Sequence, residues 1–232
     1  TKSSTWETQR YLDDPFDTGE NDDPDEQALW LYGVARHRLT TVDDLIDSGM
    51  APESRLRGVT RERIHYLIRE YEAFKKAKSK IDFEDMLERE SGIRLPVSVL
   101  IADEVQDNSP LLWKVLDGWG QHVTLRIHAG DPYQAIYSFA GAAPELFRGR
   151  EKNGRWITIG NSHRFDEASA EYARAVITAA HGDDPILRSW QGVGSDSRPR
   201  DGSELHLART HSLLAAHRAE LLDAGAPFLE YG

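Results

Sequence analysis

The sequence predicts an α/β protein whose first part is helical. Two observations predict this class: short apolar runs alternate with helix-like stretches from residue 96 onward, and apolar residues recur at helical spacing between residues 25 and 90. Buried apolar strands separated by helices are typical of a parallel sheet that is covered on both faces. The length of 232 residues allows one large domain or two small ones. We therefore expect a helical region followed by two α/β pieces.

The helical region comprises three stretches, at 28–39, 41–49 and 61–80. Gly49 is placed to end the second stretch, and Thr60 is a suitable N-cap for the third. In the third stretch, apolar side chains recur every three or four residues and form one stripe: Ile64, Leu67, Ile68, Tyr71 and Phe74. This spacing predicts an amphipathic helix.

The remaining elements alternate along the chain. The expected strands lie at 97–103, 123–130, 156–160, 204–209 and 226–232, and the expected helices lie at 109–118, 143–148, 166–181 and 211–224. Residues 191–203 (QGVGSDSRPRDGS) are expected to form a loop because glycine, serine, proline and aspartate dominate them.

Composition excludes several classes of protein. The formal net charge is -11, and residues 1–30 contribute -7 of it, from nine acidic and two basic residues. An acidic chain is not a purely electrostatic nucleic-acid binder, which needs clustered cations, although a local groove is still possible. The absence of cysteine excludes a disulfide scaffold, a thiolate metal site and a cysteine nucleophile. No apolar run reaches the length of a membrane span and no signal peptide is evident, so we expect a cytoplasmic protein without membrane contact.

The first apolar strand leads directly into an acidic doublet, Asp103 and Glu104. Ligands of open parallel sheets bind outside the carboxyl ends of the strands. Two adjacent carboxylates in a half-buried crevice repel each other unless a cation is present, and Mg²⁺ held by one or two carboxylates and substrate phosphates would relieve that repulsion. The alternative is that the two acidic residues simply follow the strand and bind no ligand.

The next strand leads into residues 130–142, GDPYQAIYSFAGA. Together with the DEVQD run at 103–107, this segment closely resembles the second and third motifs of UvrD/Rep-type superfamily 1 helicases, DE-x-QD and GD-x-x-Q-x-IY-x-F/W-x-GA. Residues 159–165 (IGNSHRF) are similar to the family's fourth motif. Weaker matches stand at 81–87 (IDFEDML), which resembles the DF-x-D-L-L segment, and at 207–232. The resemblance covers roughly residues 60–232.

The resemblance implies a partial pair of RecA-like, P-loop NTPase lobes with a helical insertion, and it implies the cofactors ATP and Mg²⁺. Asp103 would bind Mg²⁺, and Glu104 would position the hydrolytic water next to the metal. Gln106 and Gln134 would sense the terminal phosphate. Arg164 would reach the same phosphate from the second lobe as an arginine finger.

The resemblance also implies contacts with single-stranded DNA. Tyr137 and Phe139 would stack on bases, which contributes roughly 1–3 kcal/mol per base. Packing against the following helix is the alternative for both, and Ile136 is expected to be in the core. His163 stands where the family usually has an aromatic residue and could stack on a base or on the nucleotide.

The sequence departs from the family at several points. Ala140 stands where arginine is usual and Ser162 where asparagine is frequent. No G-x-x-x-x-G-K-[ST] phosphate loop occurs in the 232 residues, and the family's last two motifs are missing. We therefore expect an internal portion of a longer helicase whose remaining segments belong to the same or another chain.

The sequence thus predicts part of an ATP-dependent DNA helicase that translocates on single-stranded DNA, acts at single/double-strand junctions in repair or replication, and by family resemblance moves 3′ to 5′. The expected division is an acidic loop and helical insertion at 1–90, the later part of a first lobe at 91–150, and the start of a second lobe at 151–232. One alternative is a non-catalytic helicase-like module that binds DNA or protein. A weaker one is a nuclease that uses Asp103, Glu104 and Asp107 as metal ligands.

Overall fold

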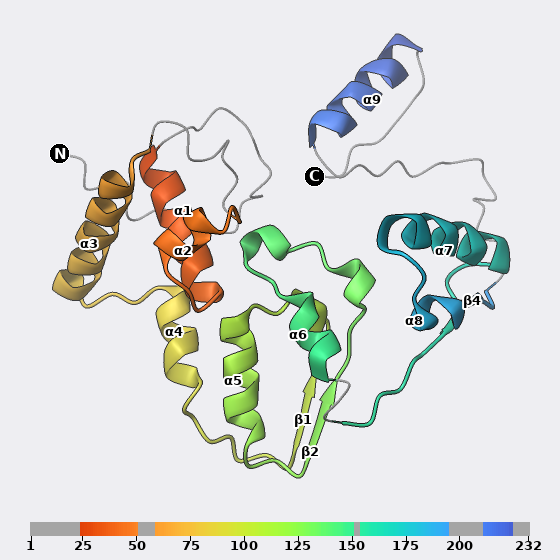
Figure 1. Cartoon of the computed structure of the whole chain (residues 1–232), viewed down its shortest axis with the longest axis horizontal. Coiled ribbons are helices and arrows are strands. Elements are labelled where there is room, and N and C mark those ends of the chain that lie inside the picture. The colour runs from red at the N-terminus through yellow and green to blue at the C-terminus, as the bar shows by residue number, and fades with distance from the viewer. Residues whose placement is uncertain (1–23, 51–58, 151–153, 195–210, 225–232) are drawn as a thin grey trace. The chain divides into compact units, whose positions relative to one another are not determined.

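The computed structural model describes residues 24–50, 59–150, 154–194 and 211–224 (Figure 1). The chain divides into two compact units, Thr1–Gly154 and Arg155–Gly232. The elements of the first unit are α1 (Pro24–His37), α2 (Val42–Asp47), α3 (Arg61–Lys78), α4 (Phe83–Glu90), β1 (Val99–Ala102), η3 (Val105–Asp107), α5 (Pro110–Gly120), β2 (Leu125–His128), η4 (Pro132–Gln134), η5 (Ser138–Ala140) and α6 (Pro144–Gly149). Those of the second are β3 (Asn161–Ser162), α7 (Glu167–His181), α8 (Pro185–Arg188), β4 (Gln191–Gly192) and α9 (His211–Asp223).

Helices α1 to α3 share one hydrophobic core at the start of the first unit (Figure 1). Its buried side chains come from all three helices: Ala28, Leu31, Ala35, Val42, Leu45, Ile64 and Leu67. The expected N-cap is confirmed, because Thr60 accepts a hydrogen bond from the Arg63 amide. Gly49 follows the C-cap of α2 with φ = 71°, so the predicted end of this helix is also confirmed.

Strands β1 and β2 form a two-stranded parallel sheet in which Val99 pairs with Leu125 and Ala102 with His128. Helix α5 connects the two strands, and its apolar face is buried at Leu111, Trp113 and Val115. A parallel pair needs such a crossover connection, and the predicted strand–helix–strand order is confirmed here.

The expectation that this sheet is covered on both faces is wrong for the part of the chain that the structure describes. Alternate residues share a face of a strand, and four such side chains are 42–66% exposed: Val99, Ile101, Leu125 and Ile127. The apolar run predicted a strand correctly, but periodicity cannot tell whether a second layer packs on it.

The second unit contains the two-residue parallel pair β3–β4 and the helices α7, α8 and α9. The strand expected at 156–160 is wrong, and pairing with β4 occurs at Asn161–Ser162 instead. Ile157 and Ile159 are 69% and 88% exposed. The reason is the partner: β4 follows α8 almost directly and offers only two residues to pair with, inside a segment that was expected to be a loop. The strands expected at 204–209 and 226–232 lie outside the described residues.

Candidate functional site

The acidic doublet lies directly after β1. Asp103 and Glu104 both have exposed side chains, and the Glu104 amide donates a 2.9 Å hydrogen bond to Asp103 Oδ1. Glu104 has φ = 53°, in the left-handed region that non-glycine residues rarely adopt. Such a conformation costs on the order of 1–3 kcal/mol and is found preferentially at functional sites. The sharp turn that it makes separates β1 from the short helix η3.

Gln106 connects the acidic doublet to the loop after β2. Its side chain is 2% exposed, and Nε2 donates to Glu104 Oε2 at 2.7 Å and to Asp107 Oδ2 at 3.3 Å. At the other end, Oε1 accepts a 3.0 Å hydrogen bond from the Asp131 amide. A buried amide with partners at both ends has a fixed orientation. The structure therefore brings the DEVQD run and the GDPYQ run together through one side chain.

Backbone hydrogen bonds continue the pairing of these two segments beyond the strands. The Ala129 amide donates to the Ala102 carbonyl at 2.8 Å, and the Val105 amide donates to the Ala129 carbonyl at 3.0 Å. Gly130 follows in close contact, so that a Cβ atom there would overlap Gln106 Oε1. Glycine is required at this position by close approach rather than by an unusual backbone angle.

Asp131 holds Gln134 in place. Its Oδ2 accepts a 2.9 Å hydrogen bond from Gln134 Nε2, and its Oδ1 accepts a 3.0 Å bond from the Tyr133 amide. The Gln134 side chain is exposed. Asp131 and Gly130 were not singled out by sequence reasoning as site residues, although the Gly-Asp pair after a strand was visible and aspartate at the start of a turn commonly bonds the backbone two residues on.

Asp107 lies on the inner side of the same loop. Burial raises the pKa of its carboxyl, and the charge of Glu104 adds to this. Hydrogen bonds from the backbone amides of Ile136 and Tyr137 and from the Gln106 side chain act in the opposite direction without outweighing burial. The Asp107 carboxyl is therefore easier to protonate than that of a solvent-exposed aspartate.

The aromatic residues of the loop are only partly described. Tyr137 is 48% exposed, so its ring is accessible, whereas the side chain of Phe139 lies outside the described part of the structure. Ile136 was expected in the core and is 66% exposed, which makes that expectation wrong. It lies between the short helices η4 and η5, in a surface segment that presents its backbone inward to Asp107.

The remaining predicted site residues belong to the second unit. His163 and Arg164 follow β3 with exposed side chains, and the Arg164 amide donates a 3.3 Å hydrogen bond to Ser162 Oγ. No ion pair of the Arg164 guanidinium is found within the described residues. The structure thus groups Asp103, Glu104, Gln106 and Gln134 in the first unit. That Arg164 acts at the same phosphate as these residues stays a prediction.

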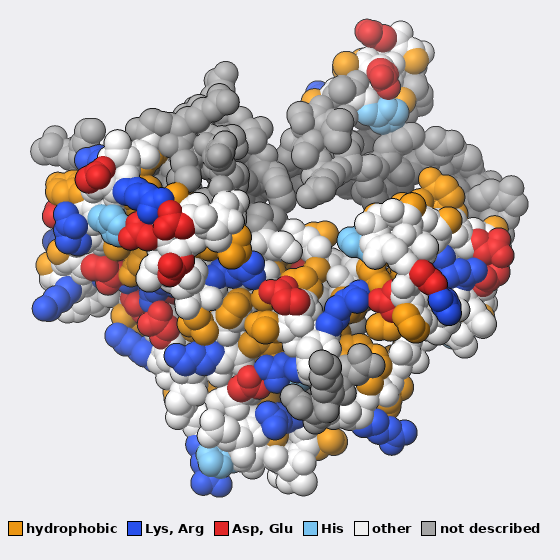
Figure 2. Space-filling view, viewed as in Figure 1, with side chains coloured by type: hydrophobic (Ala, Val, Ile, Leu, Met, Phe, Trp, Pro, Cys, Tyr) orange, Lys and Arg blue, Asp and Glu red, His pale blue; other side chains and the backbone are white. Residues whose placement is uncertain are grey.

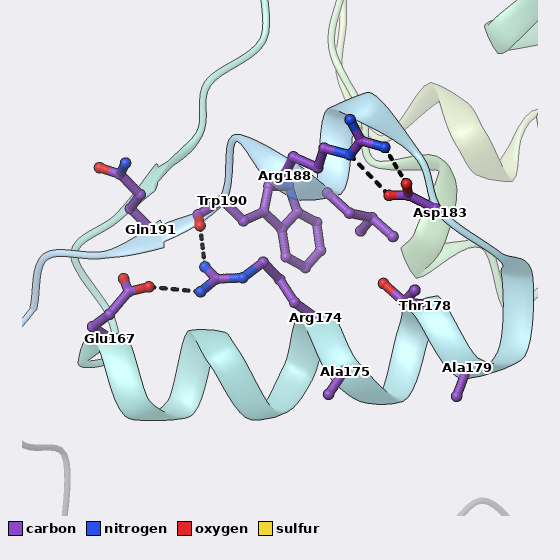
Figure 3. A pocket seen from close by; sticks show the side chains of 10 residues that line it. Glu167, Arg174, Ala175, Thr178, Ala179, Asp183, Arg188, Trp190 and Gln191 are labelled. Carbon is purple, nitrogen blue, oxygen red and sulfur yellow. Dashed lines mark hydrogen bonds and ion pairs between the residues drawn. The ribbon is translucent and has the colours of Figure 1, made fainter.

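A hollow of about 690 Å³ lies in the second unit between α7 and the α8–β4 segment (Figure 3). Arg174 points from α7 toward Glu167 and the Trp190 carbonyl and bonds to both, while Arg188 pairs with Asp183. The Glu167–Arg174 pair lies within α7 and the Asp183–Arg188 pair lies at α8, so only the hydrogen bond from Arg174 to the Trp190 carbonyl joins α7 to the segment that follows α8. None of the predicted site residues lines this hollow.

Charges of both signs are interspersed over the helices α1 to α3 on the face drawn in Figure 2.

Within the described ranges, no group of three or more histidine and carboxylate side chains gathers as a metal site, so the nuclease alternative lacks its ligand cluster there. Among the described helices, none combines the length and the apolar character that a membrane crossing requires.

Comparison with known proteins agrees with these motifs. The family described as UvrD/REP helicase N-terminal domain matches residues 36–154, just over half of the chain. The ATP-dependent DNA helicase UvrD2 of Mycobacterium tuberculosis is 31% identical over 131 residues, which cover 49% of this chain and 19% of that protein. The RecBCD enzyme subunit RecB of Mycolicibacterium smegmatis is 27% identical over 127 residues, 49% of this chain and 12% of that protein.

A second RecB subunit, from Mycobacterium tuberculosis, is 33% identical over 90 residues, 37% of this chain and 8% of that protein. The chain therefore spans a fifth or less of the length of these relatives. The family match includes the acidic doublet, the Gln106 bridge and the whole of the GDPYQAIYSFAGA segment. The resemblance seen in the sequence is confirmed, and the chain belongs to the UvrD/REP helicase family.

Proposed function

We propose that this chain supplies part of the ATP-hydrolysing and DNA-gripping machinery of a DNA helicase that translocates 3′ to 5′ on single-stranded DNA. In this proposal residues 91–150 are the later part of one RecA-like lobe, residues 151–232 begin a second, and residues 1–90 include a helical insertion. The named relatives, a DNA helicase and the RecB subunits of two RecBCD enzymes, support the class of activity.

The observation that carries the proposal is the Gln106 bridge. One buried amide contacts the Glu104 carboxylate at 2.7 Å and the Asp131 backbone at 3.0 Å. Asp131 in turn orients Gln134. A side-chain amide that links a hydrolytic carboxylate to a second loop can report the state of a bound phosphate from one loop to the other.

The carboxylates of the acidic doublet fit Mg²⁺. Within the described residues, Asp103 Oδ1 accepts the Glu104 amide and Glu104 Oε2 accepts the Gln106 amide, which leaves a second oxygen on each exposed carboxylate, and Mg²⁺ prefers such oxygen ligands. When bound, Mg²⁺ would neutralise charge on the phosphates. Asp103 would hold the metal, and Glu104 would orient the water that attacks the terminal phosphate.

The protein's own groups divide the remaining work. Gln106 fixes the Glu104 carboxylate in one orientation, so that little reorganisation is needed when the water is positioned. Gln134, held by Asp131, contacts the terminal phosphate. Arg164 approaches the same phosphate from the second lobe and stabilises charge in the transition state, as cis-acting arginine fingers do. Tyr137, Phe139 and His163 stack on DNA bases.

The replacement Glu104→Gln tests this assignment. We define the assembled helicase as this chain together with its remaining helicase segments, whether these come from the same chain or another. In that assembly the variant should still bind ATP but lose turnover by about 10²- to 10⁴-fold, because the amide cannot accept the proton of the water. Steady-state ATPase assays and binding of a fluorescent ATP analogue measure the two effects.

Glu171→Gln, on the exposed surface of α7, is the matched control and should keep full turnover. Unchanged turnover in Glu104→Gln would remove this residue from the water-positioning role. An unsubstituted assembly that neither binds nor hydrolyses ATP, yet binds DNA or a protein partner, would favour the non-catalytic module instead.

A further inference from the structure

Three consecutive basic residues at the end of α1 contact both the helical part of the first unit and the loops of the candidate site. We call Arg36, His37 and Arg38 the basic triplet. Cations at the carboxyl end of a helix interact favourably with its macrodipole, which accounts for their position but not for their partners. Arg36 and His37 both contact α4 or its N-cap, His37 also contacts Ser109, and Arg38 contacts the Ala142 carbonyl.

Arg36 fastens α1 to α4, within the IDFEDML segment. Its guanidinium donates to both oxygens of Asp82 at 2.9 and 3.0 Å and to Asp85 Oδ1 at 2.7 Å. Its side chain is only 10% exposed. Burial alone would lower the pKa of Arg36, but the surrounding carboxylates raise it above its ordinary value. This contact fixes the direction in which the next two residues of the chain point.

His37 bridges α4 and the end of the DEVQD loop. Nε2 lies 3.4 Å from Glu84 Oε1, and Nδ1 lies 3.0 Å from Ser109 Oγ. Ser109 Oγ also accepts the Leu112 amide as the N-cap of α5, and its hydroxyl proton can be donated to Nδ1. In that arrangement the ring proton is on Nε2 and faces Glu84. Burial raises the pKa of Glu84, but hydrogen bonds from His37 and the backbone outweigh it, and the carboxyl stays an ionised acceptor.

Arg38 and the backbone beside it contact the end of the other loop. Arg38 Nη1 donates to the Ala142 carbonyl at 3.2 Å. Gly141 has φ = 99°, and a Cβ atom there would lie 3.0 Å from His37 Cβ. The Ala143 amide donates to the Asn108 carbonyl at 3.0 Å, so the ends of the two loops are also joined to each other.

We propose that the basic triplet sets the position of both nucleotide-contacting loops relative to the helical part of the molecule, with His37 as the positioning residue for the loop that carries Glu104 and Gln106. The inference rests on the proposed function, since it assigns a control element to the same site. The position of α4 reaches Ser109 through Glu84 and His37, over side chains that are less than one-fifth exposed. Any ligand that shifts α4 thereby shifts the loop.

Two variants of His37 separate hydrogen bonding from packing. His37→Phe keeps the ring but loses both hydrogen bonds, whereas His37→Gln loses the ring but offers one acceptor and one donor. In the assembled helicase, His37→Phe should lower kcat for ATP hydrolysis by about 10- to 100-fold with little change in KM, because loss of alignment of roughly 1 Å has effects of this size. His37→Gln should recover at least half of the loss on a logarithmic scale.

The matched control is Tyr32→Phe, which removes a 3.0 Å hydrogen bond from α1 to Glu72 without touching either loop. It should keep kcat within twofold. Equal losses in Tyr32→Phe and His37→Phe, or full activity in His37→Phe with loss in His37→Gln, would overturn the proposal in favour of helix packing alone.

Hydrogen exchange keeps this test separate from the proposed function. In His37→Phe the amides of residues 105–109 should exchange about tenfold faster, while those of α3 stay as in the unsubstituted protein. Unchanged exchange at 105–109 overturns the positioning role whatever the ATPase result. If exchange at 105–109 is faster in His37→Phe but the assembled helicase does not bind ATP, the contact between His37 and the loop is supported. The nucleotide site, and with it the control of that site by His37, is then overturned.

Discussion

At the scale of the residue, Gln106 and Gly130 form the centre of the candidate site. Gln106 is fully buried and uses both ends of its amide, and Gly130 leaves the space that its Oε1 occupies. A buried polar group that loses its partner costs about 1–3 kcal/mol, so the two positions depend on each other. The Glu104 carboxylate is oriented only as long as both are intact.

The replacement Gly130→Ala tests this dependence. The added Cβ would overlap Gln106 Oε1 and displace it from the Asp131 amide. We expect the free energy of unfolding to fall by about 1–3 kcal/mol, as for overpacked cores, and ATP turnover of the assembled helicase to fall with it. Urea denaturation and ATPase assays measure both quantities.

Gly149→Ala is the matched control for this prediction. Apart from its chain neighbours and its own helix backbone, no atom of the described residues lies within 4 Å of the position that a Cβ would take there, and its φ is not positive. It should leave the unfolding free energy unchanged or slightly higher. Equal stability of the two alanine variants would show that Gln106 moves away without penalty.

At the scale of the element, α4 is fastened to α1 and α3 by charge rather than by apolar burial. None of its residues is fully buried. Lys75 on α3, with a side chain 6% exposed, contacts Asp82 at 2.6 Å and Asp85 at 2.8 Å, and Arg36 contacts the same two carboxylates. Asp82 also caps α4 by accepting the Asp85 amide. The IDFEDML segment therefore has a structural role that its resemblance to a helicase motif did not reveal.

The replacement Asp82→Ala should be among the most destabilising in the first unit. It removes the helix cap and leaves Lys75 and Arg36 with one carboxylate fewer in a buried setting, which costs about 3–5 kcal/mol. Asp82→Asn keeps the cap and should lose less. Chemical denaturation of the chain gives the comparison, with Asp183→Ala as the exposed-pair control that should leave the midpoint nearly unchanged. Similar midpoints for the two alanine variants would contradict a buried network.

At the scale of the whole molecule, the two units carry different parts of the proposed motor. The first unit contains the carboxylates, both glutamines and the aromatic loop, and the second contains His163 and Arg164. In the proposed motor, the coupling of hydrolysis to movement would require a DNA contact that responds to the nucleotide site. Tyr137 and Phe139 follow Gln134 by only a few residues, so the segment that carries them is the proposed link between the nucleotide site and DNA.

The replacement Phe139→Ala tests this link. Loss of base stacking, worth roughly 1–3 kcal/mol per base, should lower DNA-stimulated ATPase of the assembled helicase more than basal ATPase. Titration with single-stranded oligonucleotides separates the two rates. Tyr172→Ala removes an aromatic ring that is 75% exposed on α7 and serves as the control. An equal fall of both rates in Phe139→Ala would indicate packing in the loop instead.

Local features, such as helix caps, helices and short motifs, could be predicted from the amino-acid sequence alone. The cap at Thr60, the helices α3, α5 and α7, and the order of the helicase motifs were all predicted, because each depends on residues a few positions apart. The family could be identified for the same reason, since its motifs are short contiguous runs. The strand expected at 156–160 failed because a strand also needs a partner of matching length, which no local pattern supplies.

Contacts between side chains that are distant in the sequence could be identified only in the folded protein. His37 and Ser109 are 72 positions apart, and Gln106 and Asp131 are 25 apart, yet these two contacts define the candidate site and its proposed control. The tertiary structure likewise decided that Ile136 is exposed and that one face of the β1–β2 sheet is uncovered within the described residues. The physical reason is that burial and hydrogen bonding between remote segments depend on how helices and strands pack, and packing is a property of the folded chain as a whole.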